Sequence, residues 1–165
     1  MDVIDAIKNR RSVRIYTDQE IDKEEILKII ESAVYAPSGK NLQPWRFKIL
    51  RDKNVITRIS SLIDSGKWLQ RANCIIAVYL DASKSYDVIK DNQSCGAAIQ
   101  NMMLAAYSLG ISSCWVGEIT NCEHEANSIL NVDNSNYKLC GLVSLGYSRG
   151  RVPFTRRNEI DSFLI

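Results

Sequence analysis

A run of basic residues near the start of the chain could bind a phosphate group. This arginine segment consists of Arg10, Arg11, Ser12, Val13 and Arg14. Guanidinium groups donate paired hydrogen bonds in a fixed plane, which suits a phosphate dianion, and a serine hydroxyl can complete the set of donors. The same residues could also form a solvated basic face after a short helix. Taken alone, the segment leaves both interpretations open.

A proline-bounded loop further along the chain could present amide side chains in fixed positions. This amide loop runs from Pro37 to Pro44 and contains Ser38, Asn41 and Gln43. Because proline restricts the backbone at both ends, the two amides are offered as donor and acceptor groups. The polar edge of an isoalloxazine ring requires that pattern. The alternative is an ordinary turn whose amides bond their own backbone.

A third candidate is Gly117 with Glu118, which follows the strand-like stretch Cys114-Trp115-Val116. Glycine lets a planar ligand approach the backbone closely, and the following N–H could donate to a ring nitrogen. Glu118 could instead be only a carboxylate at the entry of a helix.

Hydrophobic periodicity indicates the elements that must position these segments. Helices are expected over residues 2–9, from Asp22 to Tyr35 or Ala36, over 53–63, from Asp91 to Leu109, and in a short stretch opened by Asn121. Strands are expected over residues 45–50, 74–80, 113–116 and 139–145. Since strands 74–80 and 139–145 are apolar on both faces, they should lie inside a sheet that helices cover on each side. The pattern predicts a single α+β domain over residues 1–165.

Two of the helices carry clear end signals. Asp22 with Glu25 predicts a capping box, and Ile21 with Ile26 predicts a hydrophobic staple. Gly110 predicts a left-handed cap after the long helix. The core face of the helix that starts at Asp22 is expected to consist of Ile26, Leu27, Ile30, Ala33 and Val34.

Composition excludes several classes of function. The formal net charge of +2 is too small for a nonspecific nucleic-acid binder. Five scattered cysteines favour reduced thiols over a disulfide framework, and a single histidine, without paired cysteine spacing, argues against a metal site. The chain has no apolar run of membrane-spanning length and an acidic start unlike a secretory signal, so we expect a cytoplasmic protein without a membrane partner.

Taken together, the order and spacing of these segments resemble the nitroreductase family of flavoproteins. The resemblance covers nearly the whole chain and is carried by Arg-Arg-Ser-Val-Arg, Ala-Pro-Ser-Gly-Lys-Asn-Leu-Gln-Pro-Trp, an alanine-rich helix, Trp-Val-Gly-Glu, and Leu-Gly-Tyr before a basic tail. It implies a largely antiparallel sheet flanked by helices on both faces. It also implies a homodimer with FMN at the subunit interface, in which the C-terminal tail of each chain docks on the partner.

The resemblance implies a role for each candidate residue. One chain would contact the flavin through Arg10, Arg11, Ser12 and Arg14. Arg10 and Ser12 would face the FMN phosphate, and Arg14 would face the pyrimidine side of the ring. The partner chain would contribute Pro37, Ser38, Asn41 and Gln43. Gly117 and Glu118 would lie near N5, and Arg156 or Arg157 would return to the phosphate.

The implied reaction is a ping-pong transfer of hydride from NADH or NADPH, through FMN, to small electron-poor acceptors such as nitroaromatics or quinones. No catalytic acid, base or nucleophile is needed, because the flavin accepts and donates the electrons. Three alternatives remain open: a specialised flavoenzyme such as a dehalogenase, an enone reductase or a flavin-consuming enzyme; a non-catalytic flavin-binding protein; and a basic module that binds acidic partners. The stretch between Ile63 and Cys74 leaves little room for an extra helix over the site, so no role is assigned to Lys67 or Trp68.

Overall fold

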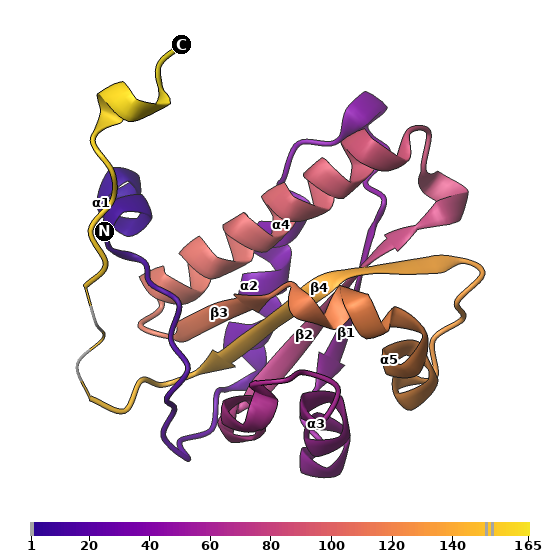
Figure 1. Cartoon of the computed structure of the whole chain (residues 1–165), viewed down its shortest axis with the longest axis horizontal. Helices are drawn as coiled ribbons and strands as arrows, with labels where there is room; N and C mark the ends of the chain where they lie inside the picture. Colours follow the sequence, from indigo (N-terminus) through magenta and orange to yellow (C-terminus); the bar gives the residue numbers. More distant parts are fainter. Residues whose placement is uncertain (1, 151, 153) are drawn as a thin grey trace.

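The computed structural model describes residues 2–150, 152 and 154–165, and its centre is an antiparallel sheet. The strands are β1 (Trp45–Leu50), β2 (Cys74–Asp81), β3 (Ser112–Val116) and β4 (Tyr137–Gly146). They form a four-stranded sheet in the order β1-β2-β4-β3, with every neighbouring pair antiparallel (Figure 1). The prediction of an α+β fold around a largely antiparallel sheet is confirmed, and β2 is buried along its whole length as its apolar sequence requires.

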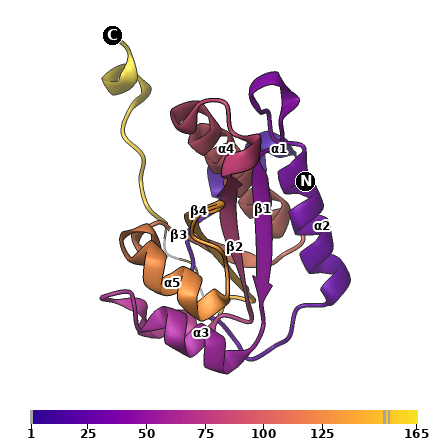
Figure 2. The same cartoon turned by 90° about the vertical axis from the view of Figure 1, so that its right-hand side faces the viewer.

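Helices cover both faces of this sheet (Figure 2). The α-helices are α1 (Val3–Asn9), α2 (Lys23–Val34), α3 (Lys53–Ser60), α4 (Val88–Ser108) and α5 (Glu123–Leu130). Short 3-10 helices are η1 (Gly39–Asn41), η2 (Gly66–Arg71), η3 (Ala82–Lys84), η4 (Glu118–Cys122) and η5 (Ile160–Phe163). Buried side chains of α2 and α4 form one core cluster with the sheet, while α3 and α5 contribute to a second cluster on the opposite face.

Helix α4 is the longest element, with 21 residues, and both of its ends have a local cause. It begins earlier than predicted because the Asp87 carboxylate accepts hydrogen bonds from the N–H groups of Ile89 and Lys90. Its last residue is Ser108, and Gly110 follows as the predicted left-handed cap, with a φ of +75° that glycine adopts readily. The N–H groups of Gly110 and Ile111 then close the last turn, as in a Schellman motif.

The predicted capping box of α2 is wrong. Asp22 occupies the N-cap position, but its side chain makes no capping hydrogen bond. Glu25 instead accepts a hydrogen bond of 3.1 Å from the Tyr147 hydroxyl, so a distant residue uses the carboxylate that a local box would need. The predicted staple residues Ile21 and Ile26 are both buried in one core cluster.

The predicted core face of α2 is partly wrong as well. The buried positions are Ile26, Ile29 and Ala33, whereas Leu27 and Val34 are exposed. Leu27 and Val34 lie seven positions apart and therefore on the same edge of the apolar stripe of α2. The sequence pattern alone does not show which edge of that stripe faces α4.

Two helix boundaries also differ from the prediction. Helix α3 ends at Ser60 rather than at residue 63, and the chain continues in tighter turns, in which the N–H groups of Leu62 and Ile63 donate to the carbonyls of Ile59 and Ser60. Helix α5 begins after a 3-10 turn with Cys122 at its N-cap, so Asn121 does not open it.

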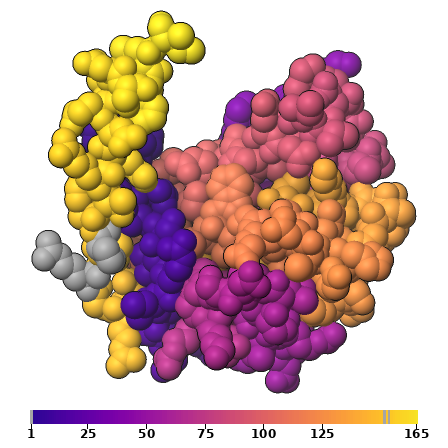
Figure 3. Space-filling view, viewed as in Figure 1, coloured from indigo at the N-terminus to yellow at the C-terminus, as the bar shows by residue number. Residues whose placement is uncertain are grey.

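The two ends of the chain lie on the outside of this layered body. The arginine segment runs beside β3, with an isolated parallel bridge between Ser12 and Ser113. The C-terminal tail, from Phe154 on, stands away from the body (Figures 1 and 2) and projects from its surface in the space-filling view (Figure 3). Its apolar residues Ile160, Phe163 and Leu164 are exposed. In the described part of the chain no helix combines the length and apolar character of a membrane span.

Candidate functional site

The arginine segment is fixed to the sheet by Tyr16, a residue that sequence reasoning did not place in the site. Tyr16 is buried, and its hydroxyl lies 2.6 Å from the Val13 carbonyl and 2.8 Å from the Ser144 hydroxyl. The Val13 N–H donates to the Ser113 carbonyl at 3.0 Å. Within the arginine segment, Arg10, Arg11 and Val13 border one cavity, whereas Ser12 and Arg14 are exposed and lie outside its lining.

Arg10, Arg11 and Arg157 form an arginine cluster where α1 ends. Burial lowers the pKa of Arg10, and the charges of Arg157 and Arg11 lower it further. The Nε atoms of Arg10 and Arg11 are both buried and have no hydrogen-bond partner among the described residues. The ion pairs that the structure describes use other cations, namely Arg46, Arg51, Lys90 and Arg156. The cluster therefore has uncompensated positive charge and an unused donor.

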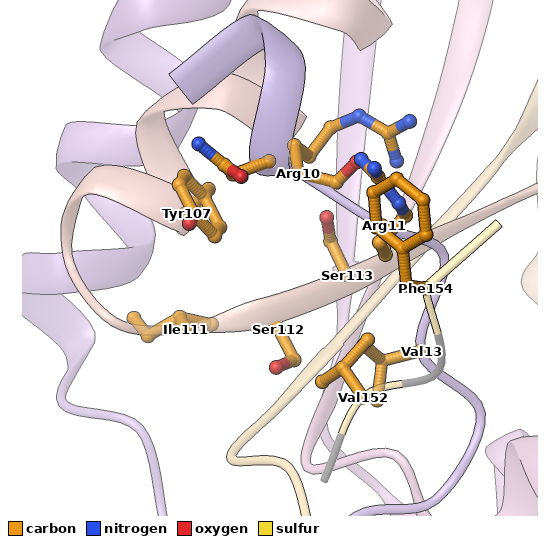
Figure 4. Close-up of a pocket in the computed structure, with 10 residues that line it drawn as sticks. Arg10, Arg11, Val13, Tyr107, Ile111, Ser112, Ser113, Val152 and Phe154 are labelled. Atoms are coloured by element: carbon orange, nitrogen blue, oxygen red, sulfur yellow. The ribbon is translucent and has the colours of Figure 1, made fainter. Parts of the chain in front are cut away.

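A cavity of about 300 Å³ lies against this cluster (Figure 4). Its polar wall consists of Asn9, Arg10, Arg11, Tyr107, Ser112 and Ser113, and Val13, Ile111, Val152 and Phe154 complete the lining. Guanidinium, hydroxyl and amide groups from α1, α4 and β3 thus converge on one space. A small anion such as a phosphate suits this set of donors.

Arg11 differs from Arg10 in what its side chain already binds. One Arg11 nitrogen donates to the carbonyls of Lys8, at 2.6 Å, and of Arg10, at 2.8 Å. Its guanidinium also lies 5.0 Å from the centre of the Phe154 ring in the tail. Arg11 therefore caps α1 and holds the tail, while Arg10 keeps more of its donors for a ligand.

The tail residues Arg156 and Arg157 interact with different charged groups. Arg156 makes an exposed ion pair of 2.6 Å with Glu159, whereas the charge of Arg157 acts on Arg10. The sequence left Arg156 and Arg157 as alternatives, and Arg157 is the one whose charge acts on Arg10.

Arg14, Trp68, Gly117 and Glu118 lie at the other end of the candidate site. The Arg14 guanidinium lies 5.6 Å from the centre of the Trp68 ring in η2. The Glu118 carboxylate accepts a hydrogen bond of 3.1 Å from the Asp64 N–H, so η4 is tied to the turn that precedes η2. A Cβ at Gly117 would meet nothing within 4 Å, which leaves space over its backbone. Strand β3 joins the two ends, since Gly117 follows Ser113 by a rise of about 13 Å.

The amide loop has an unusual backbone. Lys40, Asn41 and Gln43 have φ values of 53°, 56° and 51°, a left-handed conformation that non-glycine residues rarely adopt. The Ser38 hydroxyl accepts a hydrogen bond from the Gln43 N–H at 3.1 Å. The side-chain amide of Gln43 also donates to the Asn41 carbonyl at 3.3 Å, as expected for an ordinary turn. The side chains of Asn41 and Gln43 are nevertheless both exposed. Such strain is typical of a loop whose shape serves a ligand.

One chain does not bring the amide loop to the arginine cluster. The loop borders a hollow with Lys90 and Ser94 near the start of α4, whereas the cluster lies by Tyr107 near its end (Figure 1). At 1.5 Å per residue, Ser94 and Tyr107 are about 20 Å apart along the helix. A site that uses both segments therefore needs two chains.

Comparison with known proteins identifies the family of this chain. The model of the nitroreductase family matches residues 7–66 and 64–147. A protein of Archaeoglobus fulgidus, provisionally assigned as an NADH dehydrogenase/NAD(P)H nitroreductase, is 35% identical over 158 residues, which are 93% of this chain and 89% of that protein. The chain belongs to the nitroreductase family.

Two further relatives indicate what members of this family bind and do. The crystal structure of a provisionally assigned nitroreductase of Desulfovibrio desulfuricans in complex with FMN has a TM-score of 0.95 and 34% identity, and the match covers 100% of this chain and 96% of that one. The iodotyrosine deiodinase of Danio rerio is 27% identical, over 94% of this chain and 64% of the relative.

Sequence reasoning missed Tyr16, Trp68, Tyr107 and Phe154. Each is an aromatic residue whose position beside an arginine or a backbone carbonyl arises only from the tertiary structure. Among the described residues, no three His, Cys, Asp or Glu side chains gather as a metal site would require, and the five cysteines are free.

Proposed function

We propose that this chain is an FMN-dependent oxidoreductase that takes hydride from NADH or NADPH and reduces small electron-poor acceptors such as nitroaromatics or quinones. Membership of the nitroreductase family and the FMN complex of a relative support this proposal. The observation that carries it is the arginine cluster, in which Arg10 has an unpartnered buried nitrogen and lies close to two further arginines.

The arginine cluster would hold the FMN phosphate. A phosphate dianion supplies the negative charge that the cluster lacks, and its oxygens accept hydrogen bonds from guanidinium and hydroxyl groups. Arg10, Ser12 and Arg157 are the proposed phosphate ligands, with Arg11 holding the end of α1 in place.

Arg14 would stabilise the ring. FMN, when bound, accepts a hydride and passes electrons on, and the negative charge of its reduced form lies near N1, where a guanidinium stabilises it. Trp68 fixes the Arg14 side chain for this purpose. Glu118 begins η4, and the first N–H groups of a helix have no partner inside it, so the Glu118 N–H can donate toward N5. Gly117 leaves room for a flat ring beside it.

The proposed enzyme is a homodimer with FMN at the subunit interface. Pro37, Ser38, Asn41 and Gln43 would reach the flavin held by the partner's arginine cluster. Exposed apolar side chains support an interface, because monomeric proteins rarely leave large apolar patches in water. These side chains include Val3, Ile4 and Ile7 on α1 and Phe154, Ile160, Phe163 and Leu164 on the tail, which would dock on the partner.

Donor and acceptor would use the same ring face in turn, in a ping-pong sequence, with no protein acid or base. The deiodinase relative supports a second candidate, a specialised flavoenzyme such as a dehalogenase, within the same site.

The test is an absorbance spectrum of the purified protein with and without NADH or NADPH under anaerobic conditions. We expect a yellow protein that either nicotinamide bleaches and that releases FMN on heating. Turnover with quinones, nitroaromatics, enones and halogenated phenols then separates the candidates, and parallel double-reciprocal lines would support the ping-pong order. A protein that neither contains nor takes up FMN would contradict the proposal, and bound flavin that no nicotinamide reduces would indicate a non-catalytic flavin protein.

A further inference from the structure

Arg46, the second residue of β1, binds the end of the amide loop. One of its terminal nitrogens, Nη1, donates to the carbonyls of Gln43, at 3.3 Å, and of Trp45, at 2.7 Å. The other, Nη2, forms an ion pair of 2.7 Å with Asp81 at the end of β2. One guanidinium therefore connects the loop to the neighbouring strand.

Asp81 holds the same loop end from the other side. Its N–H donates to the Pro44 carbonyl at 2.7 Å. Its carboxylate, with only 7% of the side chain exposed, also accepts bonds from the N–H and the hydroxyl of Ser83. Burial raises the pKa of Asp81, but the bonds from Ser83 and the charges of Arg46 and Lys84 more than offset this and lower it below its ordinary value. The pair is thus ionised at neutral pH.

The conformation held in this way is one the loop would not keep on its own. Left-handed backbone at Lys40, Asn41 and Gln43 persists only where the surrounding contacts over-determine it. The Ser38 hydroxyl holds the loop from within, and Arg46 with Asp81 holds its exit. Between these contacts, Asn41 and Gln43 are exposed and make little other contact with their own chain.

We propose that Arg46, through its ion pair with Asp81, is a positioning residue that holds Asn41 and Gln43 in the conformation that contacts flavin at the partner's arginine cluster. Arg46 acts through the loop, since both of its terminal nitrogens are already bonded to its own chain. This inference rests on the proposed function, and it adds the contacts that would keep the loop in its flavin-binding conformation.

The test compares Arg46→Gln with Arg46→Lys and with Arg51→Gln in the full-length protein. Arg51→Gln is the matched control, because Arg51 follows the same strand and its 3.4 Å pair with Glu20 is exposed on both sides, at 41% and 83%. Exposed pairs of this kind contribute little to stability. Arg46→Lys keeps the charge but loses the planar pair of donors, so it should restore only part of the effect.

Two measurements separate the conformation of the loop from flavin binding. Trypsin cleavage after Lys40 in the flavin-free protein reports how often the loop opens, because a protease cuts the opened backbone. FMN titration, followed by the change in flavin fluorescence, gives the dissociation constant. The thermal midpoint of each variant shows that the body of the protein is folded.

We expect Arg46→Gln to speed cleavage after Lys40 several-fold and to raise the FMN dissociation constant about tenfold, as the loss of a charged hydrogen bond would. Arg46→Lys should lie between, and Arg51→Gln should match the wild type. The proposal is overturned if cleavage does not change, if cleavage rises while FMN affinity stays the same, or if Arg51→Gln has an equal effect. A wild-type protein that binds no FMN would instead contradict the proposed function, and the cleavage rates would still report on the loop.

Discussion

Replacing Arg10 with glutamine should weaken FMN binding without weakening the fold. Arg10 has no carboxylate partner among the described residues, and burial and two neighbouring arginines already lower its pKa. Removing its charge therefore relieves repulsion in the flavin-free protein. The free energy of unfolding should stay within about 0.5 kcal/mol of the wild type or rise slightly.

The expected loss of FMN affinity follows from the interaction removed. A hydrogen bond to a charged group contributes about 1.5–3 kcal/mol when its partner is present. At about 1.4 kcal/mol per factor of ten, Arg10→Gln should raise the FMN dissociation constant roughly 10- to 150-fold.

The assay pairs urea unfolding of the flavin-free protein with FMN titration of the same preparation. Arg156→Gln is the control from the same end of the site, because Arg156 is paired with Glu159 and exposed, so both measurements should match the wild type. The reasoning is refuted if Arg10→Gln destabilises the flavin-free protein by more than about 1 kcal/mol, which would show a structural role. An unchanged FMN dissociation constant would refute it as well.

Two further predictions concern Trp68 in the candidate site and two cysteines of the sheet. Trp68→Ala should weaken FMN binding a few-fold, as expected from the loss of a cation–π contact of about 0.5–1 kcal/mol with Arg14, and Trp68→Phe should retain most of the affinity in the same titration. Cys140 should be alkylated faster than Cys74 near neutral pH, because Cys140 is only partly buried whereas Cys74 is buried, and burial raises the pKa of Cys74 to about 12, so that little of its thiolate, the reacting form, is present. Mass spectrometry after a timed alkylation measures both rates, and equal labelling of the two cysteines would contradict this assignment.

The sequence predicts the layers of this fold well, because they depend on local periodicity. The apolar runs of β2 and β4 indicated inner strands, and Gly110 indicated the end of α4, since these signals need no knowledge of distant residues. The capping box failed for the opposite reason. Glu25 bonds Tyr147, which lies 122 residues away along the chain, and no local pattern shows that competition.

The candidate site was predictable in residue type but not in the role of each residue. Arg10 and Arg11 are adjacent and chemically identical, and only the structure shows that a terminal nitrogen of Arg11 is bonded to the end of α1, while the Nε atoms of both residues have no partner among the described residues. Left-handed backbone was equally hidden, because it occurs at Lys40, Asn41 and Gln43 rather than at Gly39. Arg46 carried no signal either, since its contacts join the loop to a strand from another part of the chain.

The central claim is that two chains build each flavin site, one with its arginine cluster and the other with its amide loop. A mixed dimer of an Arg10→Gln chain and an Asn41→Gly chain tests it most directly. Asn41→Gly removes the amide and tolerates the positive φ at that position. The two chains are purified together through different affinity tags, and each variant alone is the control.

By the symmetry of a two-fold dimer, the mixed species has one site with both defects and one site with neither. We predict that it binds about half as much FMN as the wild-type dimer, with wild-type affinity at the intact site. If one chain supplied both segments, every site would carry a defect. A mixed dimer that binds FMN no better than the two single-variant proteins would therefore contradict the account.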